Sequence, residues 1–154
     1  MKTKFLYHKM KQNIENIRSF GIDKECVEYA RRWLYLHKGL IYQDVKVAAD
    51  IWNNVSYYTR VSDRKKLPVL SLPNGSWKKP QPGDLLIYSE DYFCTGHVSV
   101  VVNIDNRSKS VQLQEQNFGN QYCAPYQQRN IHFIKLKEGY WLLDKYLLGW
   151  KSLR

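Results

Sequence analysis

Three residues of this sequence have the side-chain types that nucleophilic catalysis needs, namely Cys26, His97 and Glu115. Cys26 follows Asp23, a good helix N-cap, so the sulfur is expected in the first turn of a helix. The partial positive charge at a helix start favours the thiolate, which is the reactive form of cysteine. A free cysteine is also one of the most commonly buried residue types, so position alone leaves an inert packing role open.

The base that a cysteine nucleophile requires must come from one of the histidines His8, His37, His97 and His132. His37 lies about three turns further along the helix expected to carry Cys26, so it cannot reach back to the sulfur. His8 lies in a polar leading segment, and His132 has no carboxylate or amide in register. His97 remains, at the start of the alternating segment HVSVVVNI, which is typical of a strand.

A carboxylate that could orient His97 occurs in the next alternating segment, SVQLQEQ. The pairs expected from a hairpin that turns near Asn106 are His97–Glu115, Ser99–Leu113 and Val101–Val111. Directly opposed residues of an antiparallel pair project from one face and can touch. A slip of one residue would move Glu115 to the other face, so the hairpin register decides whether the two side chains meet.

Helical and extended patterns divide the chain into two halves. Three helices are expected first, at Lys9–Phe20, about Lys24–His37 and Val45–Val55, with Gly39 as a stop signal after the second. Four strands follow, at Asp84–Tyr88, His97–Ile104, Ser110–Gln116 and Ile131–Leu136. Between the halves, LPVLSLPNGSWKKPQPGD is rich in proline and glycine and is expected to be a long irregular connection. Helices followed by an antiparallel sheet predict an α+β fold, and 154 residues suit a single domain.

Charge, hydropathy and cysteine content indicate which binding partners and which cellular compartment to expect. The formal charge is +10, yet no nucleic-acid-binding motif accompanies the basic clusters, so we expect no nucleic-acid partner. No apolar run approaches the roughly 20 residues of a membrane span, and the charged amino end lacks the pattern of a secretory signal. Three widely spaced cysteines form no disulfide framework, so a cytoplasmic location is expected. Cys94 and His97 make a C-x-x-H pair, which without a second pair predicts neither a metal nor another cofactor.

Several blocks of the sequence occur in an order that resembles a known family; they are ECVEYARRW, LPNGS, GDLLIY, TGHVSVVV, QEQN and LGW. They resemble the CHAP domain, the cysteine- and histidine-dependent amidohydrolase/peptidase family, and within it the amidase domains of glutathionylspermidine synthetase/amidase and trypanothione synthetase. The resemblance implies a papain-like, NlpC/P60-like fold, with N-terminal helices packed on a C-terminal antiparallel sheet. It further implies that residues 1–20 form a helical lead segment and residues 21–154 one CHAP amidase domain.

The resemblance implies a role for five residues of this chain. Cys26 matches the family nucleophile, His97 its base, and Glu115 the acceptor that orients the base. Arg31 matches an arginine associated with recognition of a substrate carboxylate. Asn117 matches the asparagine of the EQN block, which is expected to form a polar wall of the site.

Glu25 departs from the family pattern, which has glutamine immediately before the nucleophile. A glutamine amide can donate to the developing oxyanion, whereas an ionised carboxylate cannot. Loss of an oxyanion donor costs on the order of 10²–10³ in rate. Three interpretations stay open: the backbone N–H of Cys26 binds the oxyanion, Glu25 points away, or the enzyme is slow or differently specialised.

The resemblance implies hydrolysis of an amide bond through a thioester, with a glutathione–polyamine conjugate such as glutathionylspermidine as the leading substrate. An acidic rim for a cationic polyamine is possible within this basic protein, from Asp23, Glu25, Glu28 and residues 89–91. Two alternatives stay open. One is a peptidoglycan amidase or endopeptidase that acts on peptidoglycan peptides, such as a phage lysin or an effector exported without a classical signal peptide. The other is a non-catalytic binding module on the same fold.

Overall fold

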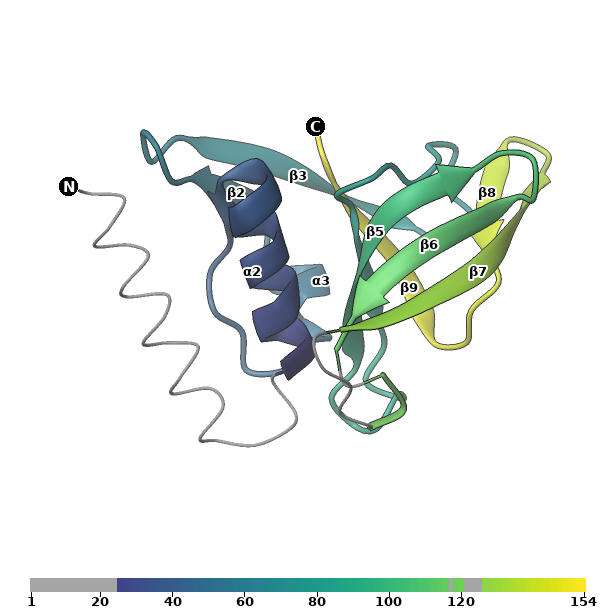
Figure 1. The fold of residues 1–154 in the computed structure, drawn as a ribbon, viewed down its shortest axis with the longest axis horizontal. Coiled ribbons are helices and arrows are strands. Elements are labelled where there is room, and N and C mark those ends of the chain that lie inside the picture. Colours follow the sequence, from purple (N-terminus) through teal and green to yellow (C-terminus); the bar gives the residue numbers. More distant parts are fainter. Residues whose placement is uncertain (1–24, 117, 121–125) are drawn as a thin grey trace.

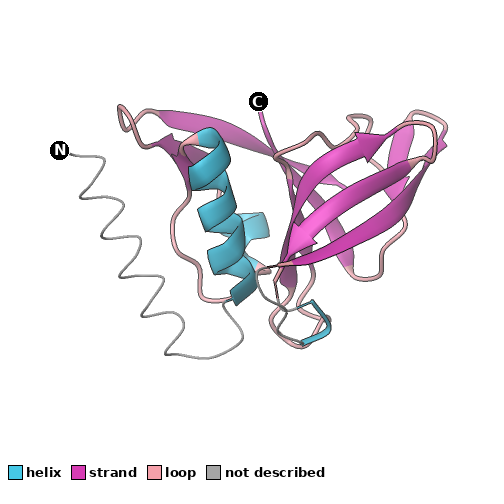
Figure 2. Ribbon diagram, in the orientation of Figure 1, coloured by secondary structure: helices cyan, strands magenta, loops and turns pink. Residues whose placement is uncertain are grey.

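The computed structural model describes residues 25–116, 118–120 and 126–154. Two α-helices, α2 (Glu25–Lys38) and the short α3 (Asp50–Asn54), accompany one large sheet in this part of the chain (Figures 1 and 2). Neither helix has the length and apolar character that a membrane crossing requires. The expected helix Lys9–Phe20, the expected cap Asp23 and the lead segment 1–20 lie outside the described residues, so they stay predictions.

Helix α2 turns one apolar stripe toward the sheet. The buried residues of the stripe recur at the three- and four-residue spacing of a helix face; they are Cys26, Val27, Ala30, Trp33 and Leu34. On the flank of the stripe, the Tyr29 hydroxyl donates to Gln114 Oε1 at 3.1 Å, which ties the helix to the sheet. The helix ends at Gly39, which has a φ of 63° and donates its N–H to Tyr35 O at 3.0 Å. The predicted stop signal is therefore confirmed.

The described strands form one antiparallel sheet in the order β1-β2-β3-β9-β4-β5-β6-β7-β8. Their bounds are β1 Leu40–Ile41, β2 Tyr57–Arg60, β3 Lys66–Pro73, β4 Leu85–Tyr88, β5 His97–Asp105, β6 Ser110–Glu115, β7 Gln127–Leu136, β8 Gly139–Leu142 and β9 Leu147–Leu153. The last strand of the chain therefore lies in the middle of the sheet, between β3 and β4. One hydrophobic core lies between α2 and the sheet, and a second lies among strands β3 to β9.

The far end of the sheet curls back toward its middle (Figure 1). In β8, the backbone of Tyr140 accepts from Gly75 N at 2.7 Å and donates to Ser76 O at 2.8 Å, in the turn that follows β3. The Asn74 side chain accepts from Leu142 N and donates to Leu142 O. These bonds satisfy backbone groups that an open strand edge would expose.

The four expected strands are present as β4, β5, β6 and β7, but the expected irregular connection is wrong in its first part. Strand β3 runs through it, paired with β2 on one side and β9 on the other. Its prolines Pro68 and Pro73 are exposed, while Val69 and Leu72 are buried. The strand survives because one proline lies on its outer face and the other at its end, where a missing N–H costs least.

The third expected helix, Val45–Val55, is also wrong in length, because only Asp50–Asn54 is helical. The backbone N–H of Ala49 donates to Thr95 O at 3.1 Å, so it is not available for a helical bond to Val45. This contact ties the loop before α3 to the segment that leads into β5. A tertiary hydrogen bond has thus replaced the helical pattern locally.

Candidate active site

The structure brings Cys26 and His97 together. Cys26 is the second residue of α2 and only 4% exposed, and His97 is the first residue of β5. Their side chains are close enough that Cys26 is one of the groups that raise the pKa of His97. One ring nitrogen of His97, Nε2, lies 2.7 Å from Glu115 Oε1, so Nδ1 is the nitrogen left to face the sulfur. The predicted order of sulfur, imidazole and carboxylate is therefore present in the geometry.

The Glu115 carboxylate is fully buried and receives four hydrogen bonds from described residues. Oε1 accepts from His97 Nε2, from Ser99 Oγ at 2.8 Å and from Arg129 Nη2 at 3.1 Å. Oε2 accepts from Arg129 Nε at 2.6 Å. A buried carboxylate with this many donors is held both charged and fixed in orientation, which in turn fixes the plane of the imidazole.

The hairpin register that delivers Glu115 to His97 differs from the predicted one. Val101 pairs with Leu113, two residues later than expected, so the predicted pairs are wrong. Glu115 lies diagonally across from His97 rather than directly opposite it. Because side-chain direction repeats every two residues along a strand, a shift of two keeps both groups on one face, and long side chains span the diagonal.

A β-bulge in β5 explains why the register differs from the prediction by an even number of residues where the site lies. At the turn, Asp105 pairs with Ser110, which displaces the pairing by three residues from the prediction. Between Val101 and Asn103 the register changes by one, because Val102 has no partner of its own on β6. The bulge therefore takes back one residue of the displacement and returns the carboxylate to the face of the imidazole.

Arg129 is a site residue that the sequence analysis missed. It lies on β7 beside β6, and it forks onto Glu115 as described above. Its Nη2 also donates to Tyr88 Oη and to Asp144 Oδ2, each at 3.1 Å, and Tyr88 Oη donates to Asp144 Oδ2 at 2.6 Å. The strand predicted at Ile131–Leu136 stops short of Arg129. Residues two apart along a strand share a face, so a strand that began two residues earlier would place Arg129 on the same face as the buried Ile131.

Aromatic rings enclose the imidazole on several sides. The ring centroids of Tyr88, Tyr92 and Phe118 lie 5.3, 5.5 and 5.6 Å from that of His97. The guanidinium of Arg129 stacks on Phe118, with its carbon 3.4 Å from the ring centroid. These walls exclude water from the imidazole and strengthen its electrostatic contacts.

The site holds its histidine in the charged form. Burial acts to lower the pKa of His97, but hydrogen bonds and charge from Cys26 and Glu115 outweigh it and raise the pKa to about 9. Burial acts to raise the pKa of Glu115, and hydrogen bonds from His97 and Arg129 outweigh that effect and hold it below its ordinary value. At neutral pH the pair is therefore imidazolium and carboxylate.

Of the three residues predicted to bind substrate, only Arg31 has a described side chain, and its role stays a prediction. Arg31 lies on α2 with Nη1 3.6 Å from Asp44 Oδ1, and its buried Nε has no hydrogen-bond acceptor among the described residues. Glu25 begins α2, but its side chain, like the whole of Asn117, lies outside the described residues. In the described part of the chain, no three or more His, Cys, Asp or Glu side chains form a group that could hold a metal ion.

Comparisons with known proteins identify the family of this chain. A family model described as "CHAP domain" matches residues 17–117. Bifunctional glutathionylspermidine synthetase/amidase of Escherichia coli (strain K12) is 31% identical over 134 residues, which cover 82% of this chain and 21% of that protein. Trypanothione synthetase of Crithidia fasciculata is 32% identical over 126 residues, which cover 80% of this chain and 18% of that protein.

The chain thus spans about a fifth of the length of these relatives. The matched span of the family model is more than half of the chain and includes Cys26, His97 and Glu115. The resemblance seen in the sequence blocks is confirmed. With its sulfur, imidazole and carboxylate inside the matched span, the chain belongs to the CHAP domain family.

Proposed function

We propose that this chain is a thiol-dependent amidohydrolase in which Cys26 is the nucleophile, His97 the acid and base, and Glu115 the orienting carboxylate. The observation that supports it is the order of groups in the site: the Cys26 sulfur acts on the His97 imidazole, which is hydrogen-bonded to the Glu115 carboxylate, and Arg129 donates to that carboxylate in turn. An inert packing cysteine has no need of a charged histidine at its side. In the same proposal, residues 21–154 form one CHAP domain with a papain-like placement of a helix-borne sulfur against a strand-borne histidine.

The first half of the reaction forms a thioester. An imidazolium at His97 lets Cys26 react as a thiolate, and its sulfur attacks the amide carbonyl carbon. The first N–H groups of a helix have no partner within it, so the Cys26 N–H at the start of α2 is available to the oxyanion. His97 then gives its proton to the amine nitrogen as the carbon–nitrogen bond breaks.

The second half of the reaction restores the enzyme. A water molecule gives a proton to the now neutral His97 and attacks the thioester carbonyl. The carbon–sulfur bond breaks, the acid product leaves, and Cys26 returns as a thiolate beside the imidazolium. Glu115 keeps the ring in one orientation through both halves, since its two oxygens are held by Arg129 and Ser99.

The proposed substrate is an amide whose leaving group is a cationic amine, as in a glutathione–polyamine conjugate. A hollow of about 290 Å³ carries Asp50, Glu90 and Asp91 in its lining. Ala49 also lines it and is hydrogen-bonded to Thr95, two residues before His97. This hollow supports the acidic rim expected from residues 89–91, and local carboxylates attract a polyamine even though the whole chain is basic.

The net charge of +10 favours a second candidate, an amide of anionic peptidoglycan. The two substrates differ in the charge of the group beside the scissile bond, so one experiment separates them. The cytoplasm remains the proposed compartment for the first substrate, because it keeps thiols reduced, and export without a classical signal accompanies the second.

The test is an assay of purified protein with glutathionylspermidine and, separately, with purified peptidoglycan. Release of free spermidine supports the polyamine substrate, and release of muropeptides supports the peptidoglycan substrate. Cys26→Ala must abolish either release, while Cys94→Ala, which alters an exposed cysteine, must not. No release from either substrate, together with slow labelling of Cys26 by a thiol-reactive electrophile, would overturn the proposal in favour of a binding module.

A further inference from the structure

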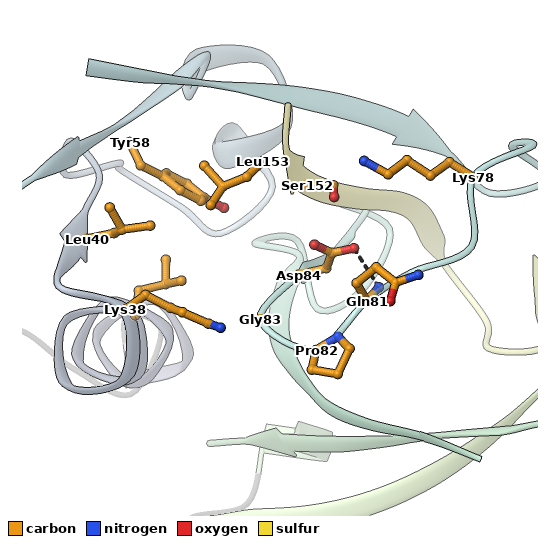
Figure 3. A pocket seen from close by; sticks show the side chains of 11 residues that line it. Lys38, Leu40, Tyr58, Lys78, Gln81, Pro82, Gly83, Asp84, Ser152 and Leu153 are labelled. Carbon is orange, nitrogen blue, oxygen red and sulfur yellow. Dashed lines mark hydrogen bonds between the residues drawn. The ribbon is translucent and has the colours of Figure 1, made fainter. Parts of the chain in front are cut away.

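A second hollow lies at the opposite end of α2 from Cys26. It has a volume of about 220 Å³, and its polar lining consists of Lys38, Tyr58, Lys78, Gln81, Asp84 and Ser152 (Figure 3). Leu34, Leu40 and Leu153 contribute apolar surface. Lys38 is twelve residues beyond Cys26 in one helix, a separation of about 18 Å at the rise of an α-helix. The hollow therefore belongs to a different part of the molecule from the candidate active site.

The Tyr58 hydroxyl is a buried polar group that lacks a hydrogen-bond partner among the described residues. Tyr58 is only 1% exposed, and its hydroxyl points to the side of the hollow where Asp84 and Ser152 lie (Figure 3). Other buried tyrosines here are satisfied; Tyr42, for example, donates to Val27 O at 3.2 Å. An unpaired buried hydroxyl is costly to keep, so its presence at a hollow points to a partner that is not part of the chain.

Two ammonium groups reach the hollow without an ion pair to any carboxylate that the structure describes. Lys38 and Lys78 extend into it from opposite sides (Figure 3), and no ion pair joins either one to a described carboxylate. Lys38 lies over Gly83, where an added Cβ would come within 3.1 Å of the lysine Cε. The absence of a side chain at Gly83 therefore leaves this lysine room to lie along the rim.

Asp84 is the only carboxyl group among the described residues that line this hollow. Its Oδ2 accepts from the Gln81 N–H at 2.8 Å. Burial raises its pKa to about 6, against the opposing effects of the Gln81 amide, the Ser152 hydroxyl and the charges of Lys78 and Lys38. Below that pH the group is neutral and gains an O–H that can donate.

We propose that this hollow binds a small carboxylate with a short aliphatic body. The two lysines and the Tyr58 hydroxyl donate to the carboxylate oxygens, and the leucine side chains cover the aliphatic part. Two facing cations and one internal carboxylate leave a net positive charge, which excludes an amine as the occupant. Because a ligand carboxylate is repelled by ionised Asp84, binding takes up a proton and tightens as the pH falls.

The groups that face Asp84 come from every element around it, and they are consistent with ligand binding that tightens as the pH falls. Lys38 comes from α2, Tyr58 from β2, Lys78 and Gln81 from the loop before β4, and Ser152 from β9. No second carboxyl group among these residues competes for the proton. The hollow is independent of the proposed function, since none of its residues contacts Cys26 or His97 in the interactions described above.

The probe for this proposal is 4-methylpentanoate, titrated into the full ¹⁵N-labelled chain with amide chemical shifts as the readout. Shifts should concentrate at residues 38, 58, 83 and 152, and the affinity should be about tenfold higher at about pH 5.5 than at about pH 7.5. Isopentylamine, of similar shape and opposite charge, should not bind there. Inorganic phosphate, which has no aliphatic part, should bind more weakly than the probe. Stronger binding of either control would overturn the proposal.

Four variants alter the groups of the hollow one at a time, and two further variants serve as controls. Lys38→Gln, Lys78→Gln and Tyr58→Phe should each weaken probe binding by about five- to tenfold, whereas Lys46→Gln, an exposed lysine elsewhere, should not. Asp84→Asn should remove the pH dependence and hold the affinity near the low-pH value. Cys26→Ala should bind the probe normally, which separates this proposal from the amidase one.

Thermal unfolding tests whether the Tyr58 hydroxyl is truly without a partner in the free protein. Tyr58→Phe should leave the melting temperature unchanged or raise it, because no hydrogen bond is lost. Tyr42→Phe, the matched control, should lower it, because the bond to Val27 O is lost. A lower melting temperature for Tyr58→Phe, or undiminished probe binding by that variant, would overturn the assignment.

Discussion

The polar groups near the two ends of helix α2 differ in whether their hydrogen bonds and ion pairs are completed by described residues. At the first end, the Glu115 carboxylate receives bonds from His97, Ser99 and Arg129, and Arg129 is in turn held by Asp144. At the other end, two lysine ammonium groups face a hollow, and neither they nor the Tyr58 hydroxyl has an ion-pair or hydrogen-bond partner of this kind among the described residues.

This difference fits the two kinds of site proposed above. A reaction centre needs its charges fixed before the substrate arrives, so its hydrogen bonds are completed within the protein. A pocket that binds a ligand reversibly leaves donors open for the ligand to satisfy. Removal of a partner should therefore be damaging at the first end of α2 and nearly harmless to stability at the other end.

The largest effect is expected from Cys26→Ala, which removes the reacting atom. Turnover of the amide substrate should fall by roughly 10⁴-fold or more, while the fold is retained. The measurement is kcat/KM for amine release, with circular dichroism as a check of folding. Comparable activity in Cys26→Ala and the unmodified chain would break the assignment of the first end as the reaction centre.

Arg129→Met should have the next largest effect, on stability. It leaves the buried Glu115 charge without its fork of hydrogen bonds, and the free energy of unfolding should fall by about 3–5 kcal/mol. Urea unfolding measures this. The matched control is Arg60→Met, which breaks the exposed pair with Asp63 and should change stability little. Equal effects in the two variants would contradict the importance of the buried network.

Glu115→Gln should reduce kcat/KM by about 10²-fold and change its pH dependence. In the unmodified chain the imidazolium is lost as the pH rises through about 9, so the rate should fall there. Without the carboxylate charge, the pKa of His97 falls, and this basic limb should move to lower pH. A basic limb at the same pH in both proteins would show that Glu115 does not tune His97.

The same group links stability to pH. The pKa of His97 is raised in the folded chain, so its contribution to stability is complete below about pH 6.5 and is lost as the pH rises through about 9. Urea unfolding across this range should therefore show a decline that Glu115→Gln reduces.

The smallest effect is expected from Tyr88→Phe, which removes one hydroxyl from the network. That hydroxyl donates to Asp144 and accepts from Arg129, so its loss should cost about 1 kcal/mol of unfolding free energy. Tyr58→Phe removes a hydroxyl of equal burial from the other end of α2 and should cost nothing. If the two variants lose the same stability, the contrast between the two ends is wrong.

Local patterns were sufficient to predict the parts of the site that depend on local structure. The expected helix start, its stop at Gly39 and the alternation of β5 and β6 placed Cys26, His97 and Glu115 on elements that the structure brings together. The register could not be derived, because it depends on the length of the turn and on the bulge at Val102. The face was nevertheless correct, since the error was an even number of residues.

Contacts between distant segments were beyond the reach of those patterns. Arg129 and Asp144 join the site only because β7 lies beside β6 and the loop before β9 lies beside β4. Strand β3 was obscured by Pro68 and Pro73, whose positions on the strand are harmless only once its pairing with β2 and β9 is known. The residues within one segment do not indicate which distant strand or loop will lie beside it.

The single unpaired residue in β5 has a consequence for insertions in this hairpin. A one-residue insertion or deletion between His97 and the turn would rotate the imidazole and the carboxylate to opposite surfaces, unless another bulge compensated for it. An insertion of two residues would keep both groups on one face but would move His97 about 7 Å further along the sheet from Glu115, beyond the 2.7 Å contact that the two side chains now make. The length of the β5–β6 hairpin is therefore constrained in two ways, by the face on which each group lies and by the distance between them.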